Sequence, residues 1–280
     1  MLHSNALLRA TRKSIRDEIY SHQGLQDAIT WARGRGAIYF PSGGNLGDGL
    51  IGLGTLDLFD HFNFHPEVRV GWQTNVLQGE RNLVINCAGG MVEGLWKDFT
   101  RVLQPFLEAG GEAVLLPCTV NGYYEFFNRF GKQITIFARE QTTYNHLQGI
   151  DSLAGRVHLC HDLAFAVDYD RTGWPEGSSG SDTHLSLLRS DEESGGHSKP
   201  RDNIDLALVW NGLQWFDRSV CMPPLTAAAQ LIHQFDTVRT DRLHMSVLAA
   251  LMGKRVTMLS NAYFKNRSVY DYTLHRFKHV

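Results

Sequence analysis

Two patterns of apolar residues recur along the 280-residue chain. Short runs that are apolar at nearly every position predict strands, and longer segments with an apolar residue at every third or fourth position predict helices. Strands without polar alternation are typical of a parallel sheet covered by helices on both faces, so the first part of the chain predicts a doubly wound α/β fold. The predicted strands are residues 36–40, 67–72, 82–87, 112–117, 133–138 and 156–161, and predicted helices lie at 50–62, 95–110 and 142–150, after a helical start.

The composition changes after residue 170. Residues 171–184 and 190–203 are rich in Gly, Ser, Pro and charge, which predicts loops, the first of them a linker. The sequence therefore predicts an N-terminal α/β lobe over residues 1–170 and a smaller C-terminal α/β lobe over residues 171–280. In the second lobe the α/β pattern continues with apolar runs at 185–190 and 204–210. Helices are predicted at 225–235 and 243–252, and short strands at 236–240 and 255–260.

Charge and composition narrow the class of protein. The 27 Lys and Arg residues nearly balance the 29 Asp and Glu residues, so the charge does not indicate nucleic-acid binding. The four cysteines lie tens of residues apart and predict reduced thiols, mostly in the core. No signal peptide and no run of roughly 20 apolar residues is recognisable, so we expect a cytoplasmic protein. The basic stretch 9–16 predicts either a solvated helix face or a peripheral contact with the inner membrane.

A glycine-rich turn, Pro41–Ile51, follows the predicted strand 36–40. Ligands of parallel α/β sheets bind where strands lead into helices, and a helix N-terminus behind glycines suits phosphate or carboxylate. Three glycines here spell G-x-G-x-x-G, but the next predicted strand does not end in the acidic residue that a dinucleotide site requires. Two alternatives remain, an anion site or a tight turn in which Asp48 only caps the helix.

A second strand-to-helix junction carries Arg139, directly after the predicted strand 133–138. Thr142 or Thr143 is the predicted N-cap of the helix that follows. Arg139 is either a ligand contact or a surface partner of Glu140.

The third junction precedes the predicted helix 243–252. Thr240 or Asp241 is its predicted N-cap, which places Arg242 and His244 in the first turn, where cations oppose the helix dipole. A local rule broken at such a junction points to a functional site. Either an anion offsets the cost, or Arg242 pairs with Asp241 and His244 bonds a backbone carbonyl.

The three junctions belong to a longer series of motifs in a specific order. The series is GGNLGDGLI (43–51), NCAGGMVEGLW (86–96), LPCTV (116–120), FAREQTTYNHL (137–147), HDLAF (161–165), LLRSDEE (187–193) and VRTDRLHMSVLAALMGKRVTMLSNAYFKN (238–266). From about residue 43 to residue 271 the chain thereby resembles the polysaccharide pyruvyl transferase family, which moves an enolpyruvyl unit from phosphoenolpyruvate onto a sugar as a cyclic ketal. The resemblance implies two Rossmann-like lobes, similar to GT-B glycosyltransferases.

The resemblance also implies roles for individual residues. The family's A-R-E arginine falls on Arg139, and its R-L-H arginine and histidine fall on Arg242 and His244. In the family these basic positions are implicated in holding or activating phosphoenolpyruvate. The other matched positions are Asn45, Gly47 and Asp48 of the N-x-G-D turn, beside Gly44, and Asn261, Tyr263, Lys265 and Asn266 of the terminal N-x-Y-x-K-N segment.

The chain departs from its relatives at a few of these positions. After R-L-H, relatives commonly have glycine and a second histidine, where this chain has Met245 and Ser246, so we expect a bulkier pocket floor. Arg255 stands in place of a common proline, and Ala88 in place of a glycine.

Phosphoenolpyruvate carries about three negative charges near pH 7, which suits arginines and a helix N-terminus. We hypothesise that His244 is the general acid or the partner of the leaving phosphate, that Arg242 and Arg139 bind the anionic groups, and that Asp48 or Asp241 takes a hydroxyl proton. The scheme requires no metal and no cofactor, because phosphoenolpyruvate is the donor substrate. The expected acceptor is a sugar of a bacterial exopolysaccharide or its lipid-linked oligosaccharide precursor. The expected substrate-binding residues are Gly44, Asn45, Gly47, Asp241, Arg242, Lys265 and Asn266.

Other functions remain open from the sequence. A GT-B-type glycosyltransferase would place the diphosphate of a nucleotide sugar at the same basic cluster. A non-catalytic anion- or glycan-binding protein would keep only the scaffold. An NAD-dependent oxidoreductase comes last, because the strand-end carboxylate is missing.

Overall fold

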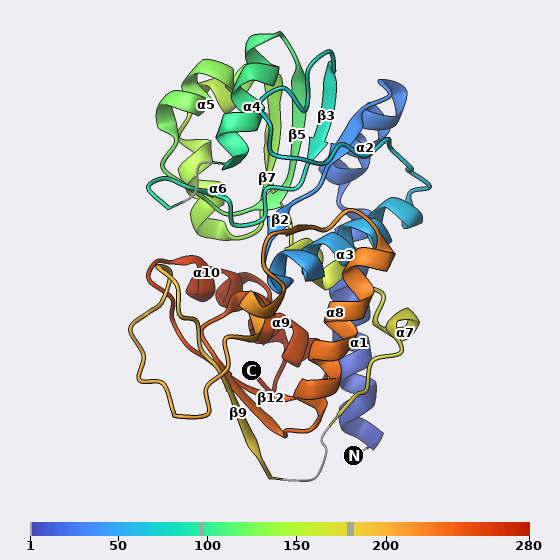
Figure 1. Cartoon of the computed structure of the whole chain (residues 1–280). Coiled ribbons are helices and arrows are strands. Elements are labelled where there is room, and N and C mark those ends of the chain that lie inside the picture. Colours follow the sequence, from blue (N-terminus) through green and yellow to red (C-terminus); the bar gives the residue numbers. More distant parts are fainter. Residues whose placement is uncertain (1, 96–97, 178–181) are drawn as a thin grey trace. The chain divides into compact units, whose positions relative to one another are not determined.

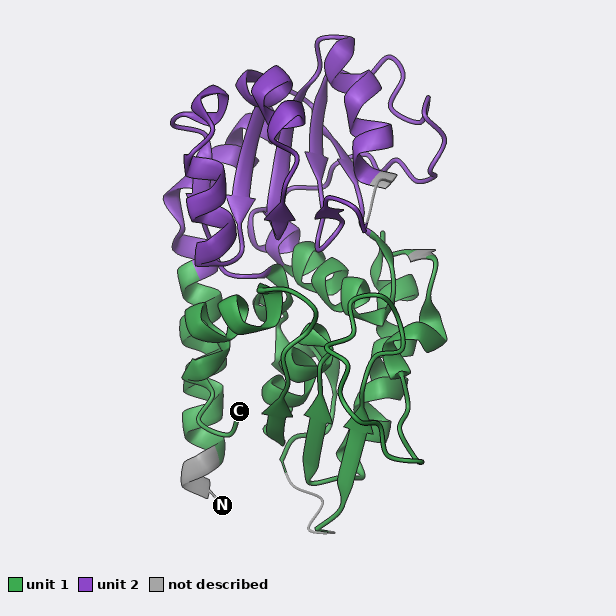
Figure 2. Ribbon diagram, turned by 90° about the vertical axis from the view of Figure 1, so that its left-hand side faces the viewer, with its two compact units in different colours: residues 1–18, 43–57, 163–280 green, residues 19–42, 58–162 purple. Residues whose placement is uncertain are grey.

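The computed structural model describes residues 2–95, 98–177 and 182–280 (Figure 1). Residues 96–97 of the predicted helix 95–110 and residues 178–181 of the predicted linker lie outside the described residues. The chain forms two compact units (Figure 2). Unit 1 consists of Met1–Glu18, Gly43–Asp57 and Leu163–Val280, and unit 2 of Ile19–Ser42 and Leu58–Asp162.

A five-stranded parallel sheet forms the centre of unit 2, in the order β1-β3-β5-β7-β8. Its strands are almost wholly apolar and buried, as a sheet covered on both faces requires. Figure 1 shows α2 on one side of this sheet and α4, α5 and α6 on the other. The elements are α2 (Gln23–Gly34), β1 (Ile38–Phe40), β3 (Asn82–Ile85), β4 (Met91–Val92), α4 (Asp98–Glu108), β5 (Glu112–Cys118), β6 (Val120–Asn121), α5 (Tyr124–Phe130), β7 (Ile134–Ala138), α6 (Gln141–Gln148) and β8 (Val157–Leu159).

Unit 1 contains a smaller parallel sheet in the order β12-β11-β9. Helix α9 packs on β11 and β12, and its residues Met245–Leu251 are all buried. The elements are α1 (Leu2–Ser21), β2 (Gly43–Gly44), α3 (Leu46–His61), α7 (Tyr169–Thr172), β9 (His184–Leu187), β10 (Leu213–Gln214), α8 (Arg218–His233), β11 (Thr237–Thr240), α9 (Leu243–Leu251), β12 (Arg255–Met258) and α10 (Lys265–Tyr272); the boundaries between the units fall inside α1 and α3.

The units interleave along the chain, which differs from the single division predicted between residues 170 and 171. Residues 1–18 and 43–57 join unit 1 because they pack on its C-terminal segment. Arg276 donates to Glu18 at 2.8 Å, and Trp215 lies directly against the backbone of α3 at Gly49. Both contacts join residues more than 160 positions apart, which no local pattern predicts.

Most predicted elements are present, and the prediction of helix-covered parallel sheets is confirmed. The predicted strand 67–72 is wrong, because only Val68 bridges to Tyr39. Apolar and polar residues alternate in this segment, and Arg69 pairs with Glu80, outside the five-stranded sheet, at 2.7 Å. Residues 204–210 form a 3₁₀ turn, Leu206–Trp210, without a strand. No helix in the described residues is long and apolar enough to cross a membrane.

Candidate functional site

The glycine turn that opens α3 is held by a reciprocal pair of hydrogen bonds. The Asn45 side-chain oxygen accepts the Gly47 N–H at 2.8 Å, and Asp48 Oδ2 accepts the Asn45 N–H at 2.9 Å. This is the arrangement of a capping box. Gly44 has φ 138°, and a Cβ there would lie 2.4 Å from Asp48 Oδ2, so glycine is required. Asp48 therefore caps this turn, which is the second of the two alternatives that the sequence left open.

His244 lies directly against this turn. A Cβ built on Gly47 would be 2.8 Å from His244 Nδ1, so the imidazole rests on the bare backbone of the first turn of α3. His244 itself lies in the first turn of α9 and is partly exposed. The structure thus brings the first and third predicted junctions together within unit 1, with a titratable side chain between two helix N-termini.

Arg242 is engaged by two carboxylates from the loop after β9. Its Nε donates to Asp205 Oδ1 at 2.6 Å and its Nη2 to Asp205 Oδ2 at 2.8 Å, a bidentate pair. The same Nη2 also donates to Asp191 Oδ2 at 2.8 Å. Arg242 is only 4% exposed. Its charge is therefore largely neutralised within the protein, and the predicted pairing with Asp241 is wrong.

The predicted N-caps of α9 are also wrong. Arg242 is the N-cap residue, and its side chain makes no capping bond. Asp241 Oδ1 accepts the Arg189 N–H at 2.8 Å, and the Thr240 hydroxyl donates to Leu187 O at 2.6 Å. The Thr240 hydroxyl also accepts the Arg242 N–H at 3.0 Å, just before the helix. Both side chains that a local capping rule would use thus bond residues at the end of β9 or just after it.

Three buried polar atoms beside Arg242 have no hydrogen-bond partner within the described chain. They are Asp241 Oδ2, Asn261 Nδ2 and Asn266 Oδ1. Asn266 is otherwise well held, since its Nδ2 donates to Asp241 O at 2.7 Å and to Leu259 O at 2.8 Å. Asn266 hydrogen-bonds both Asn261 and Asp241 through other atoms, so the three residues are neighbours. Buried polar atoms are normally satisfied, which makes this neighbourhood a candidate place for an external polar group.

A second ion-paired group adjoins the first. Arg189 Nη1 donates to Glu193 at 2.6 Å, and Glu193 also accepts from Lys265. Arg189 Nε donates to Asp191 at 2.6 Å. Burial alone would raise the pKa of Asp191, but the guanidiniums of Arg189 and Arg242 outweigh it and lower this pKa to about 2. Lys265, predicted to bind substrate, therefore lies in a compensated network of cations and carboxylates.

Arg139 belongs to unit 2, apart from the other predicted site residues, which belong to unit 1. It leaves the carboxyl end of β7 and is fully buried. Its Nε donates to Thr119 Oγ1 and its Nη1 to Asp162 Oδ2, both at 2.8 Å. The prediction of a surface partner in Glu140 is wrong, because Glu140 is the N-cap of α6 and accepts the Thr143 N–H at 2.9 Å. Thr142 and Thr143 are therefore not the N-cap.

The sequence singled out neither Thr119 nor Asp162 as individual site residues. Thr119 comes directly after β5, and Asp162 is the third residue after β8, at the edge where Arg139 follows β7. Carboxyl ends of parallel strands meet at one edge of the sheet, so polar residues within three positions of each strand end were the available signal.

The G-x-G-x-x-G pattern serves packing within unit 1. Gly47, Gly49 and Gly52 all lie inside α3, which begins at Leu46. A Cβ on Gly49 or on Gly52 would come within 2.9 Å or 2.8 Å of Trp215. The indole covers this face of the helix, so two of the three glycines provide room for a buried aromatic side chain.

The two departures after R-L-H lie on the buried face of α9. Met245 is 1% exposed and Ser246 is fully buried, with its hydroxyl directed to Arg242 O at 3.3 Å. Both side chains therefore lie in the buried packing around α9.

The cysteines are free and buried, as predicted. Burial raises the pKa of Cys118, Cys160 and Cys221 to about 12, which keeps these thiols protonated and unreactive near neutral pH. In the part of the chain that the structure describes, no group of three or more His, Cys, Asp or Glu side chains could hold a metal ion.

The family model described as polysaccharide pyruvyl transferase matches residues 45–263. The structure is similar to a crystal structure of a functionally uncharacterized protein from Klebsiella pneumoniae subsp. pneumoniae, with a TM-score of 0.75 and 25% sequence identity over 90% of this chain and 94% of that chain. No curated protein matches the chain.

Proposed function

The chain belongs to the polysaccharide pyruvyl transferase family, and from this premise we propose that phosphoenolpyruvate is its donor and that a cyclic pyruvate ketal on a sugar is its product. The membership makes the chain a transferase of pyruvyl groups to a polysaccharide. The acceptor in this proposal is an exopolysaccharide sugar or its lipid-linked precursor, met in the cytoplasm or at the inner face of the membrane.

The observation that carries the proposal is the position of His244 on Gly47. Ketal formation adds a proton to the methylene carbon of phosphoenolpyruvate and joins two sugar hydroxyl oxygens to its C2, while the C2–O bond to phosphate breaks. The two hydroxyl protons balance the proton taken up and the proton left on phosphate. A histidine between two helix N-termini can deliver the first proton where anionic groups of the donor are favoured.

The surrounding groups support distinct roles. Asp241 keeps one carboxylate oxygen without a hydrogen bond to any described residue, so we assign it the acceptance of a hydroxyl proton. Asp48 is bonded into its own turn, which favours a structural role. Arg242 is paired with Asp205 and Asp191, so it reaches the donor only by exchanging a carboxylate for it. Its first role in the proposal is to hold the segment that carries His244.

The test is turnover of phosphoenolpyruvate with a polysaccharide acceptor, followed by phosphate release and by the ketal methyl signal in NMR spectra. We expect His244→Ala to lower kcat at least a hundredfold, because general acid catalysis contributes about 10² to 10⁴ in rate. His65→Ala is the control, because His65 is exposed and its ring contacts Asn63, in a different unit from His244. Full activity in His244→Ala, or release of nucleotide from a nucleotide sugar in place of phosphate, would contradict the proposal.

A further inference from the structure

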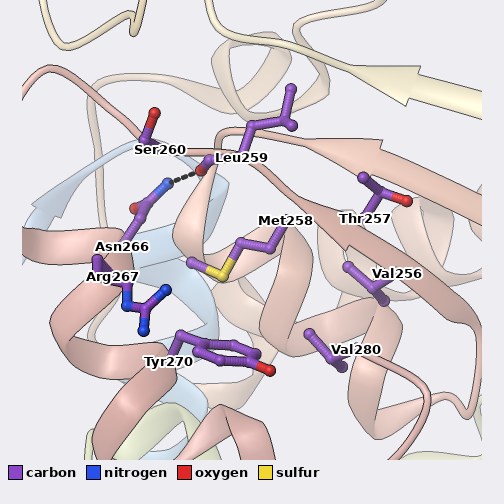
Figure 3. A pocket seen from close by; sticks show the side chains of 9 residues that line it. All are labelled: Val256, Thr257, Met258, Leu259, Ser260, Asn266, Arg267, Tyr270 and Val280. Atoms are coloured by element: carbon purple, nitrogen blue, oxygen red, sulfur yellow. Dashed lines mark hydrogen bonds between the residues drawn. The ribbon is translucent and has the colours of Figure 1, made fainter.

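A groove of about 470 Å³ follows the outer edge of β12 in unit 1 (Figure 3). This volume lies in the range of roughly 300–1,000 Å³ that is typical of small-molecule sites. Side chains of β12, of α10 and of Val280 surround it. His244 does not line the groove, but Asn266 does, and its side-chain amide donates both to Asp241 O and to O of the groove residue Leu259.

The floor of the groove is the edge of the sheet. Leu259 N–H donates to Thr240 O of β11, and Arg255 N–H donates to Asp236 O just before β11. The N–H groups of the alternate residues of β12, Val256 and Met258, therefore point away from β11, towards the groove. Val256 N–H already donates to His279 O at 2.8 Å. The Met258 N–H then has no backbone acceptor among the described residues. One rung of open edge is too short for an added strand, which favours a compact ligand over an extended peptide.

The rim combines an aromatic ring with a cation. The guanidinium carbon of Arg267 lies 5.9 Å from the centre of the Tyr270 ring, and Figure 3 shows both side chains beside the groove. Arg267 is paired through its Nε to Asp271 at 2.8 Å and remains 77% exposed on its side chain. The two Nη groups are therefore available for a carboxylate, which arginine binds through parallel hydrogen bonds. The hydroxyl of Ser260 completes the polar part of the rim.

We propose that this groove is a subsite for an acidic saccharide unit of the acceptor. The apolar face of the sugar ring packs on Tyr270, its carboxylate binds Arg267, and a ring hydroxyl accepts the Met258 N–H. The assignment of the saccharide as acceptor rests on the proposed function. It names the class of acceptor as a glycan that carries a uronic acid or an earlier pyruvate ketal near the sugar to be modified.

The test measures binding of methyl β-D-glucuronide and methyl β-D-glucoside to the full chain by saturation-transfer NMR and calorimetry. We expect the glucuronide to bind at least tenfold more tightly, and Tyr270→Ala and Arg267→Ala each to weaken it at least tenfold. Arg129→Ala is the matched control, because Arg129 is also exposed, pairs with Glu108 at 2.9 Å and lies 4.7 Å from the Phe130 ring, yet does not line the groove. Tyr270→Phe keeps the ring and should retain binding.

The outcomes separate this inference from the proposed function. Equal binding of the two glycosides, an unchanged affinity in Arg267→Ala, or binding of a short extended peptide in place of the glucuronide would overturn the subsite. Glucuronide binding that depends on Arg267 and Tyr270 supports the subsite even if phosphoenolpyruvate is not turned over. Turnover with an acidic glycan whose KM is unchanged in Arg267→Ala retains the proposed function and rejects the subsite.

Discussion

Replacement of Gly47 by alanine tests whether the position of His244 controls turnover. The new Cβ would lie 2.8 Å from His244 Nδ1 and 2.9 Å from His244 Cβ, whereas ordinary contacts begin at 3.4 Å. The imidazole must therefore retreat by about half an ångström. Because a misplacement of about 1 Å in an active site can cost roughly a hundredfold in rate, we expect kcat to fall by about tenfold or more.

The same substitution should leave the fold intact. The new Cβ would also lie 2.9 Å from Asn45 Oδ1, the end of a side chain that can shift. Alanine is favoured over glycine inside a helix by about 1 kcal/mol, which acts against this crowding in α3. Thermal unfolding by circular dichroism should therefore change little while phosphate release from phosphoenolpyruvate slows. Gly34→Ala is the matched control, because Gly34 also belongs to a helix, as the last residue of α2, and a Cβ there meets nothing within 4 Å. If Gly47→Ala turns over phosphoenolpyruvate at the wild-type rate, the contact of His244 with the Gly47 backbone does not position a catalytic histidine.

Three further predictions concern the scaffold around the site. Asp205→Ala leaves half of a buried ion pair and should lower the free energy of unfolding by about 3 kcal/mol in urea titrations, and unchanged stability would show that Asp191 suffices for Arg242. Asp191 has a pKa of about 2, below the ordinary 3.8, so its charged form should add about 2 kcal/mol of stability above pH 4 that is lost as the pH falls towards 2. Asp191→Asn should flatten that acid limb of the pH–stability curve, and a limb identical to that of the wild type would contradict the assignment. Gly54→Ala places a Cβ 1.8 Å from the backbone oxygen of Leu163 and should cost at least about 3 kcal/mol, so a well-folded, equally stable variant would contradict the close packing of α3.

The strands of the five-stranded sheet were predictable mainly because their apolar runs are continuous, whereas the shorter strands β9, β11 and β12 alternate buried with less buried positions. Buried parallel strands must be apolar on both faces, and segments such as 112–117 and 133–138 leave no other interpretation. The segment 67–72 failed because polar residues alternate in it, and Arg69 finds carboxylates outside the sheet. Periodicity does not distinguish an edge strand from an extended stretch that only touches the sheet.

The hydrogen-bond partners of the candidate site residues could not be predicted from the sequence. The broken dipole rule at Arg242 and His244 indicated the start of α9 as a candidate site, and that stays a prediction. The partners of Arg242 lie 37 and 51 positions away, in a loop that composition marks only as polar. Capping rules are local, so they could not anticipate that Asp241 would turn to the backbone of Arg189.

The interleaving of the two units imposes an order on synthesis. Unit 2 is complete once residue 162 has left the ribosome, whereas α1 and the start of α3 must wait for residues 163–280 before unit 1 can close. During that interval Gly49, Gly52 and Gly54 of α3 lack the groups that pack against them, since Trp215 and Leu163 are not yet made. Chains arrested once residue 162 has left the ribosome should therefore hold a folded unit 2 and two unassembled segments with exposed apolar side chains. The nascent protein should depend on chaperones mainly through these segments, residues 1–18 and 43–57.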